Sequence, residues 1–181
     1  MKKFFKFGCG GLILLVVLIV ALAMCSTDDD KPSTGSSGEK VETSSTKKET
    51  TDGSKKVDAS TQNVDALGLK VGLGEIKITK GKIQVGVNVH NTKDNKVTFY
   101  PDQGSAVIGD MQLDANLFLT DGDVSGDIQG GVKKEAVLEF LAPDGKDIDV
   151  ENVKEIKLMF GNVFDDNTFE SQDVTFTVPV K

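Results

Sequence analysis

One short stretch of the sequence carries oxygen ligands at the spacing of a calcium-binding loop. Asp121, Asp123, Ser125 and Asp127 occupy alternate positions, and Gly126 stands at the sixth position, where such a loop turns sharply. The twelfth position normally supplies a bidentate acid, and Val132 stands there instead. The flanking residues also have the pattern of strands and not of helices. The stretch is therefore either a calcium site or, as we favour, a solvated hairpin loop.

The other residues that could do chemistry form no recognisable catalytic motif. The single histidine, His90, falls on the polar side of an alternating strand, and no Gly-x-Ser-x-Gly sequence marks a nucleophile. Gly72-Leu-Gly74 lacks the third glycine of a dinucleotide loop and precedes no helix. Acidic side chains are so frequent after residue 60 that pairs of them arise by chance. We expect no enzymatic activity and no cofactor, calcium excepted.

Both cysteines, Cys9 and Cys25, lie in or beside an apolar segment near the start of the chain. Lys6 and Asp28 bound an uncharged run over residues 7–27. As a helix, these residues would measure about 31 Å, close to the thickness of a bilayer's hydrocarbon core. Lysines precede the run and aspartates follow it. The pattern predicts a single transmembrane helix with the N-terminus in the cytoplasm and residues 28–181 outside.

Three fates of this segment remain open. We favour an uncleaved signal anchor, because the apolar run is long and begins almost at the first residue. Ala21-Leu22-Ala23 also fits the small-x-small pattern of a signal peptidase site. In the third alternative Cys25 is the lipidated residue of a lipoprotein, although Met24 before it is larger than that signal normally allows. No cysteine follows Cys25, so the outer part of the chain has no internal disulfide.

The segment that follows has the composition of a disordered linker. Residues 26–60 contain 14 Ser or Thr residues, whereas Val41, Val57 and Ala59 are their only apolar residues. Such a segment cannot bury enough apolar surface to offset the entropy of ordering its chain. We therefore divide the chain into a membrane segment at 1–25, a linker at 26–63 and a folded domain at 64–181.

The charge of the chain excludes one class of partner. The formal net charge is −7, and all 21 basic residues are lysines. Neutralising phosphates requires clustered basic side chains, with arginine preferred for reading bases. We expect no binding to nucleic acid.

The folded domain has the alternating pattern of half-buried β-strands. Apolar residues recur at every second position in five runs, which are separated by turns rich in Gly, Asn, Asp and Pro. These runs are residues 76–79, 83–90, 136–141, 156–160 and 174–178. Strands that recur without long helical patterns between them predict an all-β fold, an antiparallel sandwich or small barrel.

Four stretches of this domain resemble a family of bacterial exported proteins whose telokin-like, immunoglobulin-like β-sandwich has no assigned function. They are Val85-Gly-Val-Asn-Val-His-Asn-Thr92, Ser125-Gly-Asp-Ile-Gln-Gly-Gly131, Ala136-Val-Leu-Glu-Phe140 and Val174-Thr-Phe-Thr-Val178. A mycobacterial secreted antigen shares that architecture. This sequence departs from the family where Gln129 stands in place of a frequent proline. The resemblance implies a Gram-positive envelope location and supplies no catalytic residues.

Together these observations predict a membrane-tethered binding or interaction module of a cell envelope. Sandwich domains recognise partners through end loops or sheet edges. The loops around residues 91–95, 121–127 and 164–168 are the first places to look. The alternative is a lipoprotein-type module that binds calcium or a solute through residues 121–127.

Overall fold

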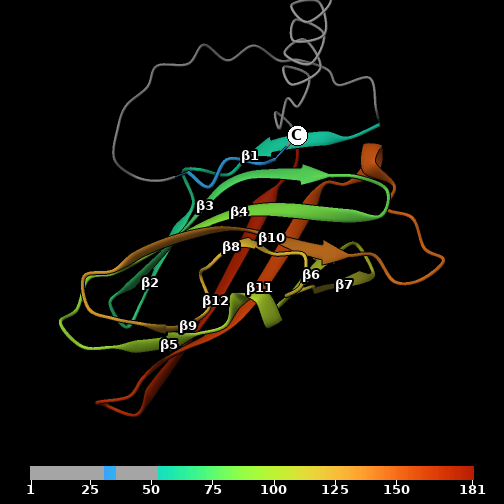
Figure 1. Cartoon of the computed structure of the whole chain (residues 1–181). Helices are drawn as coiled ribbons and strands as arrows, with labels where there is room; N and C mark the ends of the chain where they lie inside the picture. Colours follow the sequence, from blue (N-terminus) through green and yellow to red (C-terminus); the bar gives the residue numbers. More distant parts are fainter. Residues whose placement is uncertain (1–30, 36–52) are drawn as a thin grey trace, which may run out of the picture. The chain divides into compact units, whose positions relative to one another are not determined.

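The computed structural model describes residues 31–35 and 53–181 of the chain. Pro32–Lys181 belong to one compact unit. Its regular elements are strands, apart from two short 3-10 helices (Figure 1). The elements are β1 (Lys55–Asp58), β2 (Asn63–Ala66), β3 (Leu69–Ile78), β4 (Lys82–Asn91), β5 (Val97–Phe99), η1 (Pro101–Gln103), β6 (Ser105–Ile108), β7 (Met111–Ala115), β8 (Asp121–Gly122), β9 (Gly126–Ile128), β10 (Lys133–Leu141), η2 (Val150–Asn152), β11 (Glu155–Asp165) and β12 (Glu170–Pro179).

All pairings between these strands are antiparallel, as the alternating sequence pattern predicts. The hydrogen-bonded order is β1-β3-β4-β10-β7-β6-β11-β5-β9, with β12 paired to β11, β2 to β3 and β8 to β10. The β6–β7 hairpin links two halves of this path, because β7 pairs with β10 while β6 pairs with β11. In Figure 1, β11 and β12 cross behind β4 and β10. The all-β prediction is confirmed, and the five predicted runs lie in β3, β4, β10, β11 and β12.

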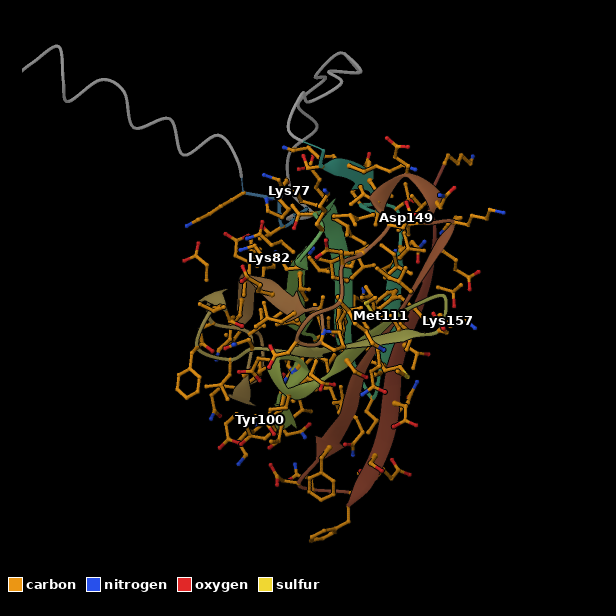
Figure 2. The ribbon with its side chains drawn as sticks, turned by 90° about the vertical axis from the view of Figure 1, so that its right-hand side faces the viewer. Lys77, Lys82, Tyr100, Met111, Asp149 and Lys157 are labelled. Carbon is orange, nitrogen blue, oxygen red and sulfur yellow. The ribbon has the colours of Figure 1, made fainter. Side chains whose placement is uncertain are left out.

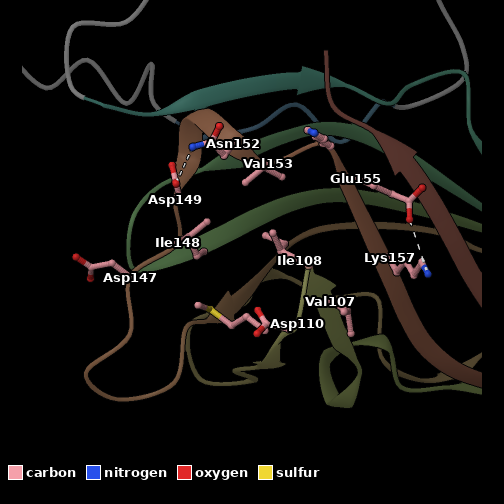
Figure 3. Close-up of a pocket in the computed structure, with 13 residues that line it drawn as sticks. Val107, Ile108, Asp110, Asp147, Ile148, Asp149, Asn152, Val153, Glu155 and Lys157 are labelled. Carbon is pink, nitrogen blue, oxygen red and sulfur yellow. Dashed lines mark hydrogen bonds and ion pairs between the residues drawn. The ribbon is translucent and has the colours of Figure 1, made fainter.

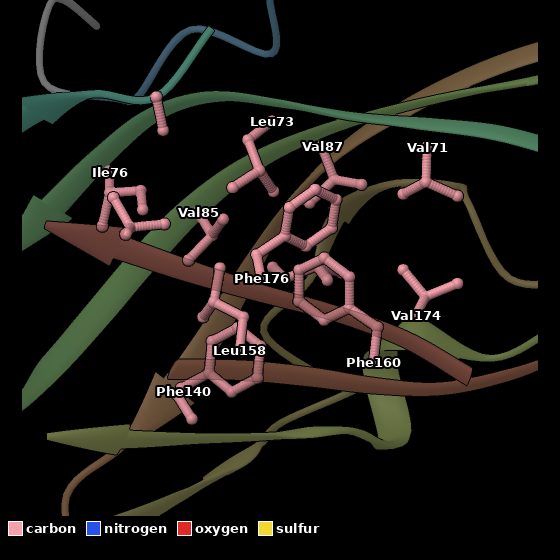
Figure 4. Close-up of a cluster of buried hydrophobic side chains, with 14 of the residues drawn as sticks. Val71, Leu73, Ile76, Val85, Val87, Phe140, Leu158, Phe160, Val174 and Phe176 are labelled. Atoms are coloured by element: carbon pink, nitrogen blue, oxygen red, sulfur yellow. The ribbon is translucent and has the colours of Figure 1, made fainter. Parts of the chain in front are cut away.

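The core lies between these two sets of strands. Alternate side chains of β3, β4 and β10 point toward those of β11 and β12, where three phenylalanines meet (Figure 4). The Phe140 and Phe160 rings stack with their centroids 6.3 Å apart, and Phe176 meets Phe160 edge-on at 5.7 Å. Such aromatic pairs stabilise a core beyond the area that they bury. Phe140, Phe160 and Phe176 are core residues, as the alternating pattern predicts, whereas Phe164 of β11 is only half-buried.

A β-bulge keeps the inner face of β11 apolar on both sides of Gly161. The register with β12 shifts between Met159 and Asn162, and Gly161 adopts a φ of +81° there. One extra residue in a strand would otherwise turn every later side chain to the opposite face. Because the bulge absorbs it, Phe160 and Val163 are both fully buried.

The folded domain begins earlier than the predicted boundary at residue 64. Residues 55–58, assigned to the linker by composition, form β1 and pair with β3 from Lys55 opposite Ile78 to Asp58 opposite Glu75. Ala59 is buried and Val57 packs against the core. The sequence signal is weak because an edge strand is held by backbone hydrogen bonds and needs few apolar side chains. The predicted membrane segment, residues 7–27, lies outside the described residues. No helix in residues 31–35 or 53–181 is long and apolar enough to cross a membrane.

Replacement of the central ring should show how far the domain depends on this core. We expect Phe160→Ala to lower the free energy of unfolding by about 3–5 kcal/mol, because it removes buried contacts and leaves a cavity. Phe118 is 87% exposed, so Phe118→Ala should change it by less than about 0.5 kcal/mol. Urea denaturation of the two variants measures the difference, and equal losses would contradict this description of the core.

Candidate functional site

The residues of the predicted calcium loop are divided between two strands with different neighbours. Asp121 and Gly122 form β8, which pairs with Val137 and Ala136 of β10. Asp127 lies in β9, which pairs with β5 instead. The predicted calcium ligands therefore do not lie in one continuous loop that could surround a single ion.

Two of the predicted calcium ligands are already bound by lysines. The Asp123 carboxylate accepts a hydrogen bond from Lys134 Nζ at 2.9 Å, and the Asp127 carboxylate accepts one from Lys96 Nζ at 2.9 Å. These contacts hold the pKa of each carboxyl below its usual value, with Thr98 also donating to Asp127. The hydroxyl of Ser125 is buried, and no hydrogen bond to it exists within the described part of the chain.

Residues 31–35 and 53–181 contain no group of three or more His, Cys, Asp or Glu side chains that could hold a metal ion. Calcium binding by Asp121, Asp123, Ser125 and Asp127 thus stays a prediction, and it would require two lysine contacts to be exchanged for metal contacts. The lipidation prediction for Cys25 falls outside the described residues.

Two of the loops that the sequence pointed to do meet at one end of the domain. Lys96 lies between Asp127 and Asp166, 2.9 and 3.1 Å from their carboxylate oxygens. Both partners raise the pKa of Lys96. The first part of the 121–127 loop is not part of this cluster, because Asp123 turns toward Lys134 on β10.

A buried carboxylate holds this end together. Asp165 is fully buried, forms an ion pair with Lys93, and accepts hydrogen bonds from Asn95 Nδ2 and the Asn167 N–H, both at 2.9 Å. The Lys93 contact is the main reason why the pKa of Asp165 lies below its usual value. Buried Asn91 extends the network, since its amide donates to the carbonyl oxygens of Asn95 and Ile128. The polar groups here bind one another, so their role is to hold the loops at this end of the domain together.

A groove in the surface of the domain lies elsewhere, between the β6–β7 hairpin and the chain around η2. This groove has a volume of about 610 Å³. Figure 2 shows Met111, Asp149 and Lys157 of its lining on the side of the domain that faces the viewer. Figure 3 shows Ile108 from the hairpin and Ile148 from the opposite wall pointing toward one another. The two walls come from segments that are about 40 residues apart in the chain.

The groove combines an apolar floor with acidic side chains at its margin. Ile108, Ile148 and Val153 supply apolar surface, whereas Asp110 and Asp147 are exposed carboxylates. Further charged residues line the margin: Asp149 accepts a hydrogen bond from the neutral Asn152 amide at 2.8 Å, Glu155 lies 3.8 Å from Lys157, and Lys154 adds a second lysine. A surface of this kind can bind a chain segment that carries both apolar and basic side chains.

Sequence reasoning missed this groove. In the sequence, Gly109-Asp110 has only the composition of a turn between strands. The signal that was present is the pair Ile148 and Val150, which carries apolar side chains outside any alternating strand. Only the fold shows that both side chains join the core and that Ile148 lines the groove with the β6–β7 hairpin.

Comparison with known proteins gives a limited result. No family model and no curated protein matches the sequence. A functionally unknown protein from Listeria monocytogenes EGD-e is similar in structure, with a TM-score of 0.49 and 13% identity over 67% of this chain and 83% of its own. A candidate lipoprotein from Bacillus subtilis has a TM-score of 0.44 and 16% identity over 68% of this chain and 39% of its own. The telokin-like family resemblance is not confirmed.

The buried Asp165 carboxylate should make the free energy of unfolding depend on pH. Because the folded pKa of Asp165 is depressed, its contribution is present above the unfolded value of about 3.9 and is lost as the pH falls through the folded value. We expect Asp165→Asn to lower stability at pH 7 and to flatten its decline between about pH 5 and pH 2. Urea denaturation across this range, with exposed Asp144→Asn as the control, tests this. Identical slopes for Asp165→Asn and the unchanged chain would refute it.

Calcium binding can be tested directly by thermal melting of the full chain in detergent. Because Lys134 and Lys96 occupy the carboxylates of Asp123 and Asp127, we expect millimolar calcium to leave the melting temperature unchanged. A ligand that binds only the native state must raise it. A rise of several degrees that a chelator reverses and Asp123→Asn abolishes would establish the calcium site.

Proposed function

We propose that this chain is a membrane-tethered, extracytoplasmic interaction module of a bacterial cell envelope, and not an enzyme. Residues 7–27 anchor it with the N-terminus in the cytoplasm, and residues 28–181 lie outside. The support is the length of the uncharged run, the lysines before it and the aspartates after it. A cleaved or Cys25-lipidated form is distinguished from this one by the intact mass of the mature chain.

The folded domain is proposed to be an immunoglobulin-like antiparallel β-sandwich. The support is the arrangement of β3, β4 and β10 on one side of the core and of β11 and β12 on the other (Figure 4). A sandwich buries alternate residues of both layers and leaves their outer faces and end loops for recognition. These outer faces and loops would be available to a partner at the cell surface.

The groove between the β6–β7 hairpin and η2 is the observation that carries the binding role. It is open to solvent, its floor is apolar, and its exposed acids Asp110 and Asp147 attract positive charge. The domain as a whole is acidic, with 20 acids against 12 lysines over residues 61–181, which favours encounter with a basic partner. The partner that fits is a protein segment with apolar and lysine or arginine side chains.

This role is tested with a labelled Lys-Leu repeat peptide titrated onto the full chain in nanodiscs. We expect Asp147→Lys to weaken binding about threefold or more, because one attraction of roughly 0.2–1 kcal/mol becomes a repulsion. Asp144→Lys changes the net charge equally but lies outside the groove, so it should leave the affinity unchanged. Fluorescence anisotropy measures both. Equal weakening by the two variants would show that binding follows net charge and not the groove.

A further inference from the structure

Four residues of the predicted linker, Pro32–Gly35, lie against the folded domain. The Glu75 N–H donates to the carbonyl oxygen of Ser33 at 2.7 Å. The Asn88 amide donates to the carbonyl oxygens of Thr34 and Gly35 at 2.6 and 3.1 Å. Pro32 is buried. A segment that is polar and without apolar runs in the sequence is thus held by specific hydrogen bonds.

Two glycines on neighbouring strands form the surface beneath this segment. A Cβ atom at Gly74 on β3 would lie 1.9 Å from the Ser33 carbonyl oxygen, and one at Gly86 on β4 would lie 2.0 Å from it. The three closest atoms to each of these positions all belong to Ser33 or Thr34. Both glycines therefore provide room for the segment, and no other described group comes as close. Glycine within a strand commonly marks such an approach of a second backbone.

The donors around this floor are also positioned by the fold. The register between β3 and β4 shifts between Leu73 and Ile76, and a bulge of this kind frees a backbone group from the ladder. Glu75 lies within the shift, and its N–H binds the segment. On the neighbouring strand β10, the carboxylate of Glu135 accepts a hydrogen bond from the Thr34 hydroxyl at 2.8 Å. Three adjacent strands thus contribute to one site.

The segment has the shape that this site requires. Gly35 adopts a φ of +67°, and a Cβ atom there would lie 2.7 Å from the Leu73 carbonyl oxygen, so a larger residue is excluded. Proline restricts the backbone before binding and so reduces the entropy that docking costs. The ligand class is an extended peptide of the form Pro-small-small-Gly.

We propose that Gly74, Gly86, Asn88 and the Glu75 N–H form a peptide-binding site whose occupant is the chain's own Pro32–Gly35 segment, and that its docking sets how far the domain extends from the membrane. The second part rests on the proposed membrane anchor. Residues 28–31 alone then join the membrane segment to the docked segment, and they span at most about 14 Å. Without the docked segment, residues 28–54 would separate the membrane segment from β1, and any flexible chain of that length has a root-mean-square span of about 30 Å.

Hydrogen exchange on the full chain in detergent micelles tests the docking. Gly86→Ala and Gly74→Ala place a methyl group where the segment lies, so the Glu75 amide, which donates to the Ser33 carbonyl oxygen, should lose protection by about tenfold or more. The amides of Val85 and Val87 should stay protected and show that the strand is intact. Gly81→Ala is the matched control, because no atom lies within 4 Å of its added Cβ.

The outcomes are distinct. Unchanged exchange at Glu75 in both Gly86→Ala and Gly74→Ala would overturn the proposal. Should neither of these variants fold, Asn88→Ala removes the same two carbonyl contacts without adding bulk and should release the segment. Loss of protection in the Gly81→Ala control as well would also overturn it, because the effect would not be specific to the site.

The reach of the domain is measured separately, by energy transfer from a dye at Asp144→Cys to an acceptor in the lipid headgroups of vesicles. Cys9→Ser and Cys25→Ser remove the other thiols. Gly86→Ala should reduce the transfer, whereas Gly81→Ala should not. Equal transfer in both would overturn the claim about reach. Failure of the unchanged chain to associate with vesicles would instead disprove the membrane anchor, and the exchange result would still decide the docking.

Discussion

The structure depends above all on the contact between two sets of strands around Phe160. This ring lies between Phe140 on β10 and Phe176 on β12, and it joins strands that are far apart in the chain. Because the alternate residues of β3, β4, β10, β11 and β12 are buried at this contact, the remaining residues must point outward. The groove, the lysine pairs and the peptide-binding site all lie on surfaces that this division creates.

Two departures from regular pairing adapt that core to the rest of the molecule. The bulge at Gly161 allows β11 to pair with β12 as far as Asp165 while Phe160 and Val163 both stay buried. The bulge in β3 leaves the Glu75 N–H to bind Ser33. In both strands a β-bulge, and not a particular side chain, sets where the neighbouring residues lie.

Charge has two separate uses in this acidic domain. At one end, Lys93 pairs with Asp165, and Lys96 pairs with both Asp127 and Asp166, so that these carboxylates hold loops together and are not offered to a ligand. At the groove, Asp110 and Asp147 are exposed above an apolar floor. The physical difference is the presence of a lysine within contact distance, because a paired carboxylate must lose that partner before it can bind another ion. An acid-rich sequence motif is for this reason a poor guide to a metal site.

The sequence by itself determined the all-β class, the five main strands and the inward position of Phe140, Phe160 and Phe176, because strand alternation is a local property that burial must respect. It also placed the loops around Asn91–Asn95 and Asp165 among the candidates, and the structure brings them together. Tertiary structure alone decided that Lys55–Asp58 is a strand, that Asp123 and Asp127 face different lysines, and that Pro32–Gly35 lies on Gly74 and Gly86. These features depend on contacts between residues from about 10 to about 50 positions apart, which no local pattern of residue types records.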